Sequence, residues 1–113
     1  MTTLPNAELA IVDERKITQY LLALNHPCHD KAIFFRRFGF RSDVPAAMRM
    51  ALLEHARSAD LVATTMTSFG VRYTIEGAMN SPDGRNPTIR SVWFIGTGEA
   101  APRLVTAYRG GHR

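Results

Sequence analysis

The stretch HPCHDKAIFFRRFGF, residues 26–40, predicts a short helix from Asp30 to Phe38. Asp30 suits the N-cap, because its carboxylate can accept a hydrogen bond from a backbone N–H of the first turn. Gly39 can take the left-handed conformation that ends many helices. The chain on either side of this stretch divides into helical patterns before residue 60 and strand patterns after it.

One side of the predicted helix is aromatic, since Phe34, Phe35 and Phe38 share a face. We expect these rings to belong to the core and Arg36 and Arg37 to lie on the solvated side. A stacking platform of rings and arginines, as in single-strand nucleic-acid binders, is the alternative. Lys31 falls on the aromatic side, so its stem is expected to point inward, behind a loop that is rich in histidine.

Upstream, residues 14–24 predict a helix with Asp13 as its N-cap, preceded by a strand-like arm over residues 1–12. Pro27 ends the helix, because the residue before a proline is pushed out of the α region. Its apolar residues recur at helical spacing and predict a buried stripe. The stripe comprises Ile17, Tyr20, Leu21 and Leu24.

Downstream, Ser42 or Asp43 is expected to cap a third helix, with Pro45 in its first turn. Its inner face is predicted to comprise Val44, Ala47, Met48, Ala51, Leu52 and His55. A histidine on such a face is more often packed and hydrogen-bonded than catalytic, so we expect a structural role for His55.

After Asp60 the hydrophobic period changes from 3.6 to 2, which predicts strands over residues 61–68, 71–79, 88–95 and 102–109. Residues 80–87 form a loop, and residues 110–113 are expected to fray. The chain therefore predicts a single α+β domain over residues 1–113. About three helices, within residues 1–59, cover one face of a four-stranded antiparallel meander within residues 60–109.

The composition is that of a basic globular protein, with 14 Lys and Arg against 10 Asp and Glu and a net charge of +4. This charge suits RNA as a partner, although a solvated basic surface would give the same count. The lone Cys28 excludes an internal disulfide. No apolar run approaches the roughly 20 residues that a bilayer span needs, and the N-terminus lacks the pattern of a signal peptide. We therefore expect a cytoplasmic protein without membrane contact, and the oligomeric state stays open.

Motifs for phosphate-cradling loops, zinc proteases and nucleophile elbows are missing from the sequence. His26 and His29 have a spacing that could hold a metal together with Cys28 and Asp30. A single short cluster is weak evidence for a metal site, so no metal or cofactor is expected.

Acid–base chemistry without a metal fits the residue types better. Cleavage of RNA by its own 2′-hydroxyl needs a base, an acid and cations around the phosphate. His26 or His29 could move the proton, and Lys31 could face the phosphate. On the third strand Arg90 shares a face with Thr88, Val92 and Phe94, and on the fourth Leu104, Thr106 and Tyr108 are expected to share a face. The alternative is an ordinary polar sheet face.

Several motifs spread over nearly the whole chain carry a resemblance. They are Leu4-Pro5-Asn6-Ala7, Tyr20-Leu21-Leu22, His26-Pro27, Lys31-Ala32-x-Phe34-Phe35, Gly39-Phe40, Arg90-x-Val92-Trp93 and Arg103-Leu104-Val105-Thr106-Ala107-Tyr108. The chain resembles a small bacterial domain family of unknown function. It is similar to the C-terminal toxin domains of polymorphic toxin and contact-dependent inhibition systems, several of which belong to the barnase, EndoU, colicin and RelE-like group of metal-independent ribonucleases.

The resemblance implies helices followed by a four-stranded sheet, and a ribonuclease that uses no metal. With the basic charge and the inward Lys31, it predicts His26 as base or acid, with His29 in reserve. Lys31 and Arg90 are predicted to bind the phosphate and the transition state, and Thr106 and Tyr108 to position the substrate.

A second hypothesis treats the chain as a non-catalytic accessory module, such as an immunity-like or phage-associated protein. Lys31 would then only snorkel along the core, and the surface would bind a protein. An immunity protein or antitoxin is the expected protein partner if the chain is a toxin. The two hypotheses differ in whether the five predicted side chains meet at one site.

Overall fold

The computed structural model describes residues 2–27 and 29–111. Its elements in chain order are η1 (Ala7–Leu9), α1 (Glu14–Lys16), η2 (Ile17–Leu21), α2 (His29–Arg37), α3 (Pro45–Ser58), β1 (Asp60–Thr67), β2 (Gly70–Ala78), β3 (Thr88–Gly96) and β4 (Arg103–Arg109). The strands form one antiparallel sheet in the order β1-β2-β3-β4. The predicted α+β fold with a four-stranded meander is confirmed.

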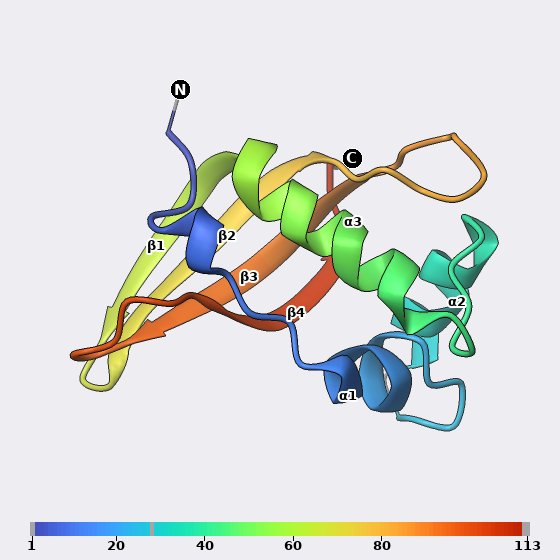
Figure 1. Ribbon diagram of the computed structural model, residues 1–113, viewed down its shortest axis with the longest axis horizontal. Helices are drawn as coiled ribbons and strands as arrows, with labels where there is room; N and C mark the ends of the chain where they lie inside the picture. The colour runs from blue at the N-terminus through green and yellow to red at the C-terminus, as the bar shows by residue number, and fades with distance from the viewer. Residues whose placement is uncertain (1, 28, 112–113) are drawn as a thin grey trace.

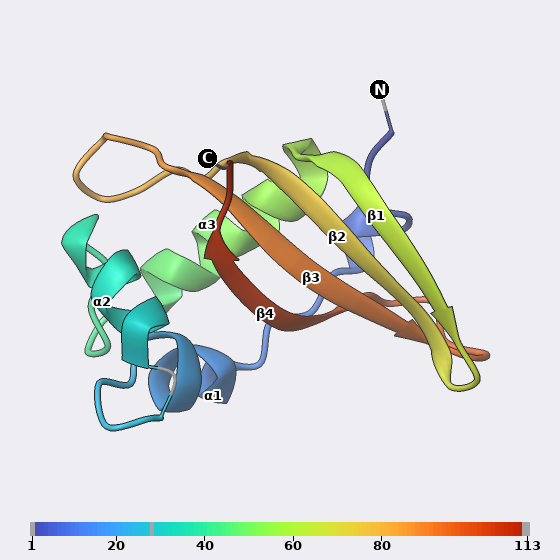
Figure 2. The ribbon, with the colours of Figure 1, turned by 180° about the vertical axis from the view of Figure 1, so that it is seen from behind.

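The long helix α3 crosses one face of the sheet (Figure 1). The opposite face is turned to the viewer in Figure 2, where the four strands lie in front of α3. In both views α1 and α2 lie together at one end of the molecule, near β4. The core fills the space between α3, the shorter helical segments and the inner sheet face. Its largest fully buried side chains are Trp93, Phe35, Phe40, Ile17, Leu21, Leu22, Met48, Leu52, Ile75, Met79, Ile89 and His55.

The aromatic helix begins one residue earlier than predicted, so Asp30 lies in its first turn and is not the N-cap. The position before His29 is Cys28, which lies outside the described residues. The predicted end at Gly39 is confirmed, since Gly39 has φ +100°. Gly39 N–H donates to Arg36 O at 3.0 Å and Phe40 N–H donates to Phe35 O at 3.4 Å, the two bonds of a Schellman motif.

The basic side of α2 differs in part from its prediction. Arg37 is exposed as expected, but Arg36 is half-buried. The Arg36 guanidinium donates to the Leu22 carbonyl at 2.7 Å and to Ser42 Oγ at 3.3 Å. Arg36 therefore ties α2 to the segments before and after it.

The first predicted helix is interrupted. Asp13 caps it as expected, accepting from Arg15 N–H at 2.9 Å. After Lys16 the chain widens into the π-helical segment η2, in which Leu22 N–H donates to Ile17 O at 2.8 Å. The wider turn changes the phase of the apolar stripe. Leu22 is buried, whereas Leu24, predicted to be inside, is 52% exposed.

The structure corrects the predicted N-cap and part of the predicted inner face of α3, and also the predicted face of β4. Neither Ser42 nor Asp43 caps α3, because Val44 is its N-cap, and Val44 and Ala47 are exposed. The rest of the predicted inner face of α3 is buried. The register of the β3–β4 ladder shifts between Val92 and Trp93. Thr106 pairs with Val92, whereas Leu104 pairs with Trp93 and is buried. The prediction that Leu104 and Thr106 share a face is therefore wrong.

The predicted strand-like arm over residues 1–12 is wrong in part, because Ala7–Leu9 form the 3-10 helix η1 and, among the described residues of the arm, only Ile11 pairs with β4. Ile11 N–H donates to Pro102 O at 2.8 Å, and Leu104 N–H donates to Ile11 O at 3.0 Å. These bonds form an isolated parallel bridge between Ile11 and Arg103. Within the described ranges 2–27 and 29–111, no helix is long and apolar enough to cross a membrane.

A buried polar chain fixes α3 on the sheet and confirms a packed, hydrogen-bonded His55. Its Nε2 lies 3.1 Å from the Gly77 carbonyl, and its Nδ1 lies 2.8 Å from Ser91 Oγ. A carbonyl can only accept, so the proton of the neutral ring lies on Nε2 and the Ser91 hydroxyl donates to Nδ1. Trp93 Nε1–H donates to the same Ser91 Oγ at 2.8 Å. Burial lowers the pKa of His55 below its ordinary value.

We expect the free energy of unfolding to decrease as pH falls below about 6.5, the unfolded pKa of histidine. Below this pH the unfolded chain binds a proton at His55, whereas the folded protein does not until the pH reaches its lowered pKa. In this interval the free energy of unfolding changes by up to about 1.4 kcal/mol per pH unit. Urea unfolding between pH 7 and 5 measures this slope. His55→Gln should flatten it and lower stability, whereas His29→Gln, at an exposed position, should retain it. An unchanged slope in His55→Gln would contradict the assignment.

Candidate functional site

Tyr20 is the centre of a cluster that joins three distant parts of the chain. Its hydroxyl lies 3.0 Å from Thr106 Oγ1 on β4. Its ring meets the His26 ring edge to face, with centroids 5.0 Å apart and planes at 71°. The Nζ atoms of Lys16 and Lys31 each lie 5.5 Å from the Tyr20 ring centroid. We call these five residues the Tyr20 cluster.

The π-helical segment explains the position of Tyr20. Ile17 and Leu21 on the same segment are fully buried and anchor it in the core. Tyr20 is half-buried, which suits a side chain with an apolar ring and a polar end. The ring therefore lies at the edge of the core, and its hydroxyl reaches β4.

Three of the five predicted site residues, His26, Lys31 and Thr106, belong to the Tyr20 cluster. Tyr108 lies two residues beyond Thr106 on the same face of β4. It lines a hollow of about 260 Å³ with Lys31 and three other residues. The other three are Asp30, Phe34 and Arg109. Tyr108 thus borders the cluster through Lys31.

Arg90 is placed differently. It is paired with Tyr108 across the β3–β4 ladder, and its Nε donates to Glu76 Oε1 on β2 at 2.7 Å. The Glu76 carboxylate, with a smaller contribution from Tyr108, raises the pKa of Arg90. Arg90 is therefore next to Tyr108 but held by Glu76, away from the contacts of the Tyr20 ring.

A wider hollow of about 410 Å³ opens beside the cluster. Its lining residues are Asp13, Arg15, Lys16, Gln19, Tyr20 and His26. Hydrogen bonds from Arg15 lower the pKa of Asp13 to about 2, so this carboxylate is ionised at neutral pH and balances Arg15. Lys16 adds a positive charge to the lining of this hollow.

The electrostatics of the cluster favour an anion. Within the part of the chain that the structure describes, neither Lys16 nor Lys31 forms a salt bridge; both ammonium groups lie over the Tyr20 ring. Such cation–π contacts contribute about 0.5–1 kcal/mol at exposed sites and leave the charge of each ammonium group in place. Each ammonium group can therefore attract an anion that reaches the cluster.

His29, the predicted reserve for His26, points elsewhere. Its side chain is 52% exposed, and Nε2 lies 3.9 Å from Asp30 Oδ1. The metal alternative also required Cys28, which lies outside the described residues. Among the described side chains, no group of three or more His, Cys, Asp or Glu could hold a metal ion.

Sequence reasoning assigned Tyr20 to the core and did not single out Lys16. Tyr20 fits the helical stripe at position i+3 from Ile17, and nothing in the pattern distinguishes a ring at the core edge from one inside it. The one available signal was its phenolic hydroxyl, which usually needs a polar partner when it is partly buried.

The Tyr20–Thr106 hydrogen bond can be tested by a double-mutant cycle. We expect Tyr20→Phe and Thr106→Val each to lower the free energy of unfolding by about 1 kcal/mol, because each leaves a half-buried hydroxyl unpaired or removes one. The double variant should lose clearly less than the sum, as measured by urea unfolding. Additive losses would show that the two hydroxyls are not coupled.

The fold occurs in a solved structure. One chain of a contact-dependent growth inhibition toxin–immunity protein complex from Klebsiella pneumoniae 342 matches with a TM-score of 0.73 and 17% sequence identity. The match covers 93% of this chain and 97% of that chain. At this identity the likeness shows a shared fold.

Curated proteins give no match to the chain. A family profile does match, over residues 3–111, and so covers nearly the whole described sequence. The resemblance to a domain family of unknown function is therefore confirmed. The chain belongs to the family described as domain of unknown function (DUF6883).

Proposed function

We propose that the protein is a metal-independent ribonuclease of the toxin type, with the Tyr20 cluster as its active site. One observation carries this proposal: His26 and Lys31 both contact the Tyr20 ring, whose hydroxyl binds Thr106. A group that can move a proton, a cation and two hydroxyls therefore meet on one surface. The positive net charge supports the same assignment, and the toxin–immunity complex that shares the fold is consistent with a toxin or an immunity-like role alike.

The proposed reaction is attack of the RNA 2′-hydroxyl on the adjacent phosphorus. His26 accepts the 2′-hydroxyl proton while the new O2′–P bond forms, and the P–O5′ bond then breaks. The leaving O5′ takes a proton from water, and the hydroxide so formed removes the proton from His26, which gives a 2′,3′-cyclic phosphate and a 5′-hydroxyl. Lys31 and Lys16 stabilise the extra negative charge on the phosphoryl oxygens in the transition state.

The sheet residues have supporting roles in this proposal. Thr106 holds Tyr20 and positions the sugar next to His26. Tyr108, on the same strand face, contacts the neighbouring phosphate across the Lys31 hollow. Arg90 is paired with Tyr108 in register, and Glu76 balances its charge, so its proposed role is to donate a hydrogen bond towards that phosphate from the open sheet face.

We expect the purified protein to cleave total RNA in the presence of EDTA. His26→Ala should slow cleavage by about 10²-fold or more, the usual contribution of a proton-transfer group. Lys31→Ala should also slow it, because it removes a charge that stabilises the transition state. Product analysis should detect 2′,3′-cyclic phosphate ends.

His29→Ala is the matched control, because His29 is an exposed histidine three residues from His26. It should cleave at the wild-type rate, and circular dichroism should show that all variants are folded. Intact RNA with the wild-type protein, or undiminished cleavage in both His26→Ala and Lys31→Ala, would reject the proposal.

A non-catalytic module that binds a protein is the second candidate, and the β1–β2 hairpin favours it. β1 is an edge strand, and residues 62–67 are exposed along its length. Met66 and Phe69, near the tip, are 79% and 80% exposed. Natural edge strands usually carry charges that block pairing, whereas residues 61–71 carry none. A partner protein, such as a toxin if the module is immunity-like, could add a strand here.

Expression in a host cell distinguishes the two candidates. A ribonuclease toxin should arrest growth unless the product of the adjacent gene is co-expressed, and His26→Ala should restore growth. An accessory module should express without harm, and it should co-purify with that product through the hairpin. Met66→Lys with Phe69→Asp should then abolish co-purification; growth arrest that His26→Ala relieves would reject the accessory role.

A further inference from the structure

A second basic hollow, which we call the arginine hollow, lies between α2, the 80–87 loop and the end of β4. Its volume is about 390 Å³. The residues that line it are Phe34, Arg37, Phe38, Arg85, Pro87, Thr88, Arg109 and Gly110. Three arginines and two aromatic rings therefore share one concave surface.

Two of these arginines lie over the rings. Arg85 Cζ is 4.4 Å from the Phe38 ring centroid, and Arg109 Cζ is 5.5 Å from the Phe34 ring centroid. Phe34 and Phe38 are themselves in contact, with centroids 5.2 Å apart. A planar guanidinium supported in this way can stack on a base, and one whose N–H groups are not already engaged can also bind a phosphate with two parallel hydrogen bonds.

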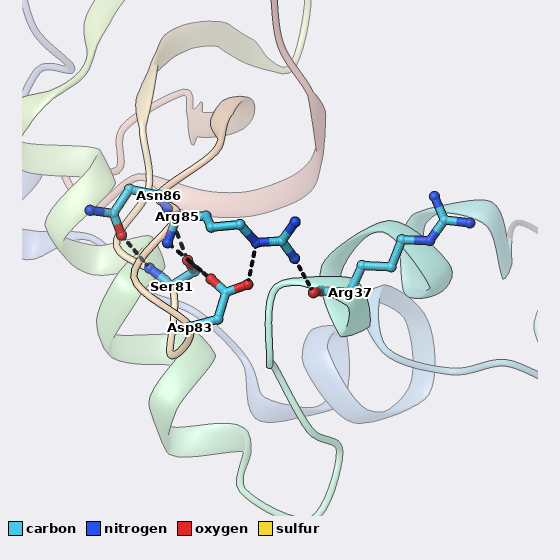
Figure 3. A network of polar contacts seen from close by, with 5 residues as sticks. All are labelled: Arg37, Ser81, Asp83, Arg85 and Asn86. Atoms are coloured by element: carbon cyan, nitrogen blue, oxygen red, sulfur yellow. Dashed lines mark hydrogen bonds and ion pairs between the residues drawn. The ribbon is translucent and has the colours of Figure 1, made fainter.

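Arg85 is held rigidly by its loop (Figure 3). Its Nε donates to Asp83 Oδ2 at 2.6 Å, and its Nη2 donates to the Arg37 carbonyl at 2.5 Å, which fastens the loop to α2. The Ser81 hydroxyl, followed by Arg85, lowers the pKa of Asp83. The negative charge that balances Arg85 is thus permanent at neutral pH.

The other two arginines are differently placed. In Figure 3 the Arg37 side chain points away from the loop network. Among the described residues, neither Arg37 nor Arg109 forms a salt bridge, and both are exposed. After Asp83 has balanced Arg85, the hollow keeps the charge of Arg109, which lies over the Phe34 ring, and Arg37 is a further exposed cation among its lining residues. It therefore complements an anion.

The arginine hollow is adjacent to the proposed active site. Phe34 and Arg109 also line the smaller hollow that contains Lys31 and Tyr108. Lys31 in turn lies over the Tyr20 ring. Cationic groups alternate with aromatic rings along this whole path, which is the arrangement that binds single-stranded nucleic acid.

We propose that the arginine hollow binds single-stranded RNA next to the cleaved bond, holding one base and the adjoining phosphates. This inference rests on the proposed function, and it specifies where the RNA next to the cleaved bond is bound. An acidic peptide would also be attracted by Arg37 and Arg109. The guanidinium groups that lie on rings favour a ligand with flat faces, and bases supply such faces.

Binding of an uncleavable probe tests the proposal. The probe is a fluorescein-labelled, fully 2′-O-methylated RNA oligonucleotide, and its Kd is measured by fluorescence anisotropy at several salt concentrations. Arg37→Gln with Arg109→Gln should weaken binding by about 10-fold at low salt. The slope of log K against log salt should become shallower by about 1.4, because each lost phosphate contact contributes about 0.7 for single strands.

Arg49→Gln with Arg57→Gln is the matched control, since it removes the same charge from exposed positions on α3. It should leave the Kd and the slope close to wild type. Equal weakening by both double variants would overturn the proposal, because only net charge would then matter. It would also be overturned if a polyglutamate peptide bound as tightly as the RNA and lost as much affinity in Arg37→Gln with Arg109→Gln.

The failures of the two proposals are distinguishable. Absence of cleavage with the predicted loss of probe binding would reject the ribonuclease and leave RNA binding in the arginine hollow. Cleavage that depends on His26, with probe binding unaffected by Arg37→Gln and Arg109→Gln, would reject the hollow alone.

Discussion

The hydrogen bonds from His55 fix how the helical half of the molecule lies on the sheet. Apolar packing alone would allow α3 to shift along the strands, because its inner face is a stripe of small and flexible side chains. The imidazole instead reaches Gly77 on β2 and Ser91 on β3 in defined directions, and Ser91 also accepts from Trp93. A buried group left without its partner would cost about 1–3 kcal/mol, so one placement of α3 is strongly preferred.

Because α3 lies on one face of the sheet, the two sheet faces have different roles. The inner face supplies Trp93 and its apolar neighbours to the core. The outer face presents Arg90 and Tyr108, and the helical segments reach only its β4 edge, where Tyr20 contacts Thr106. Most of the chemistry-bearing side chains therefore lie along one edge of the domain. The β1 edge, on the other side of the sheet, carries no charge over residues 61–67 and is apolar near its tip.

The sequence was sufficient for the architecture because helices and strands differ in hydrophobic period, and this signal is local. It was insufficient where one residue shifts the period. The π turn exposed Leu24, and the β3–β4 irregularity moved Leu104 to the inner face. For the candidate site, residue chemistry singled out His26, but only the tertiary structure could pair it with Tyr20. The ion pair between Arg90 and Glu76 could likewise not be predicted, because the two residues lie on different strands, β3 and β2.

The Tyr20–Thr106 bond joins residues 86 positions apart, and this separation has a consequence for folding. The entropy of closing so long a loop must be offset before the contact forms, so it is expected to form late, after β4 has joined the sheet. Tyr20 contacts His26, Lys31 and Thr106 and so joins the helical residues to β4. A partly folded chain therefore has a helical core and a hairpin but no assembled cluster, and any activity located there is delayed until the domain is complete.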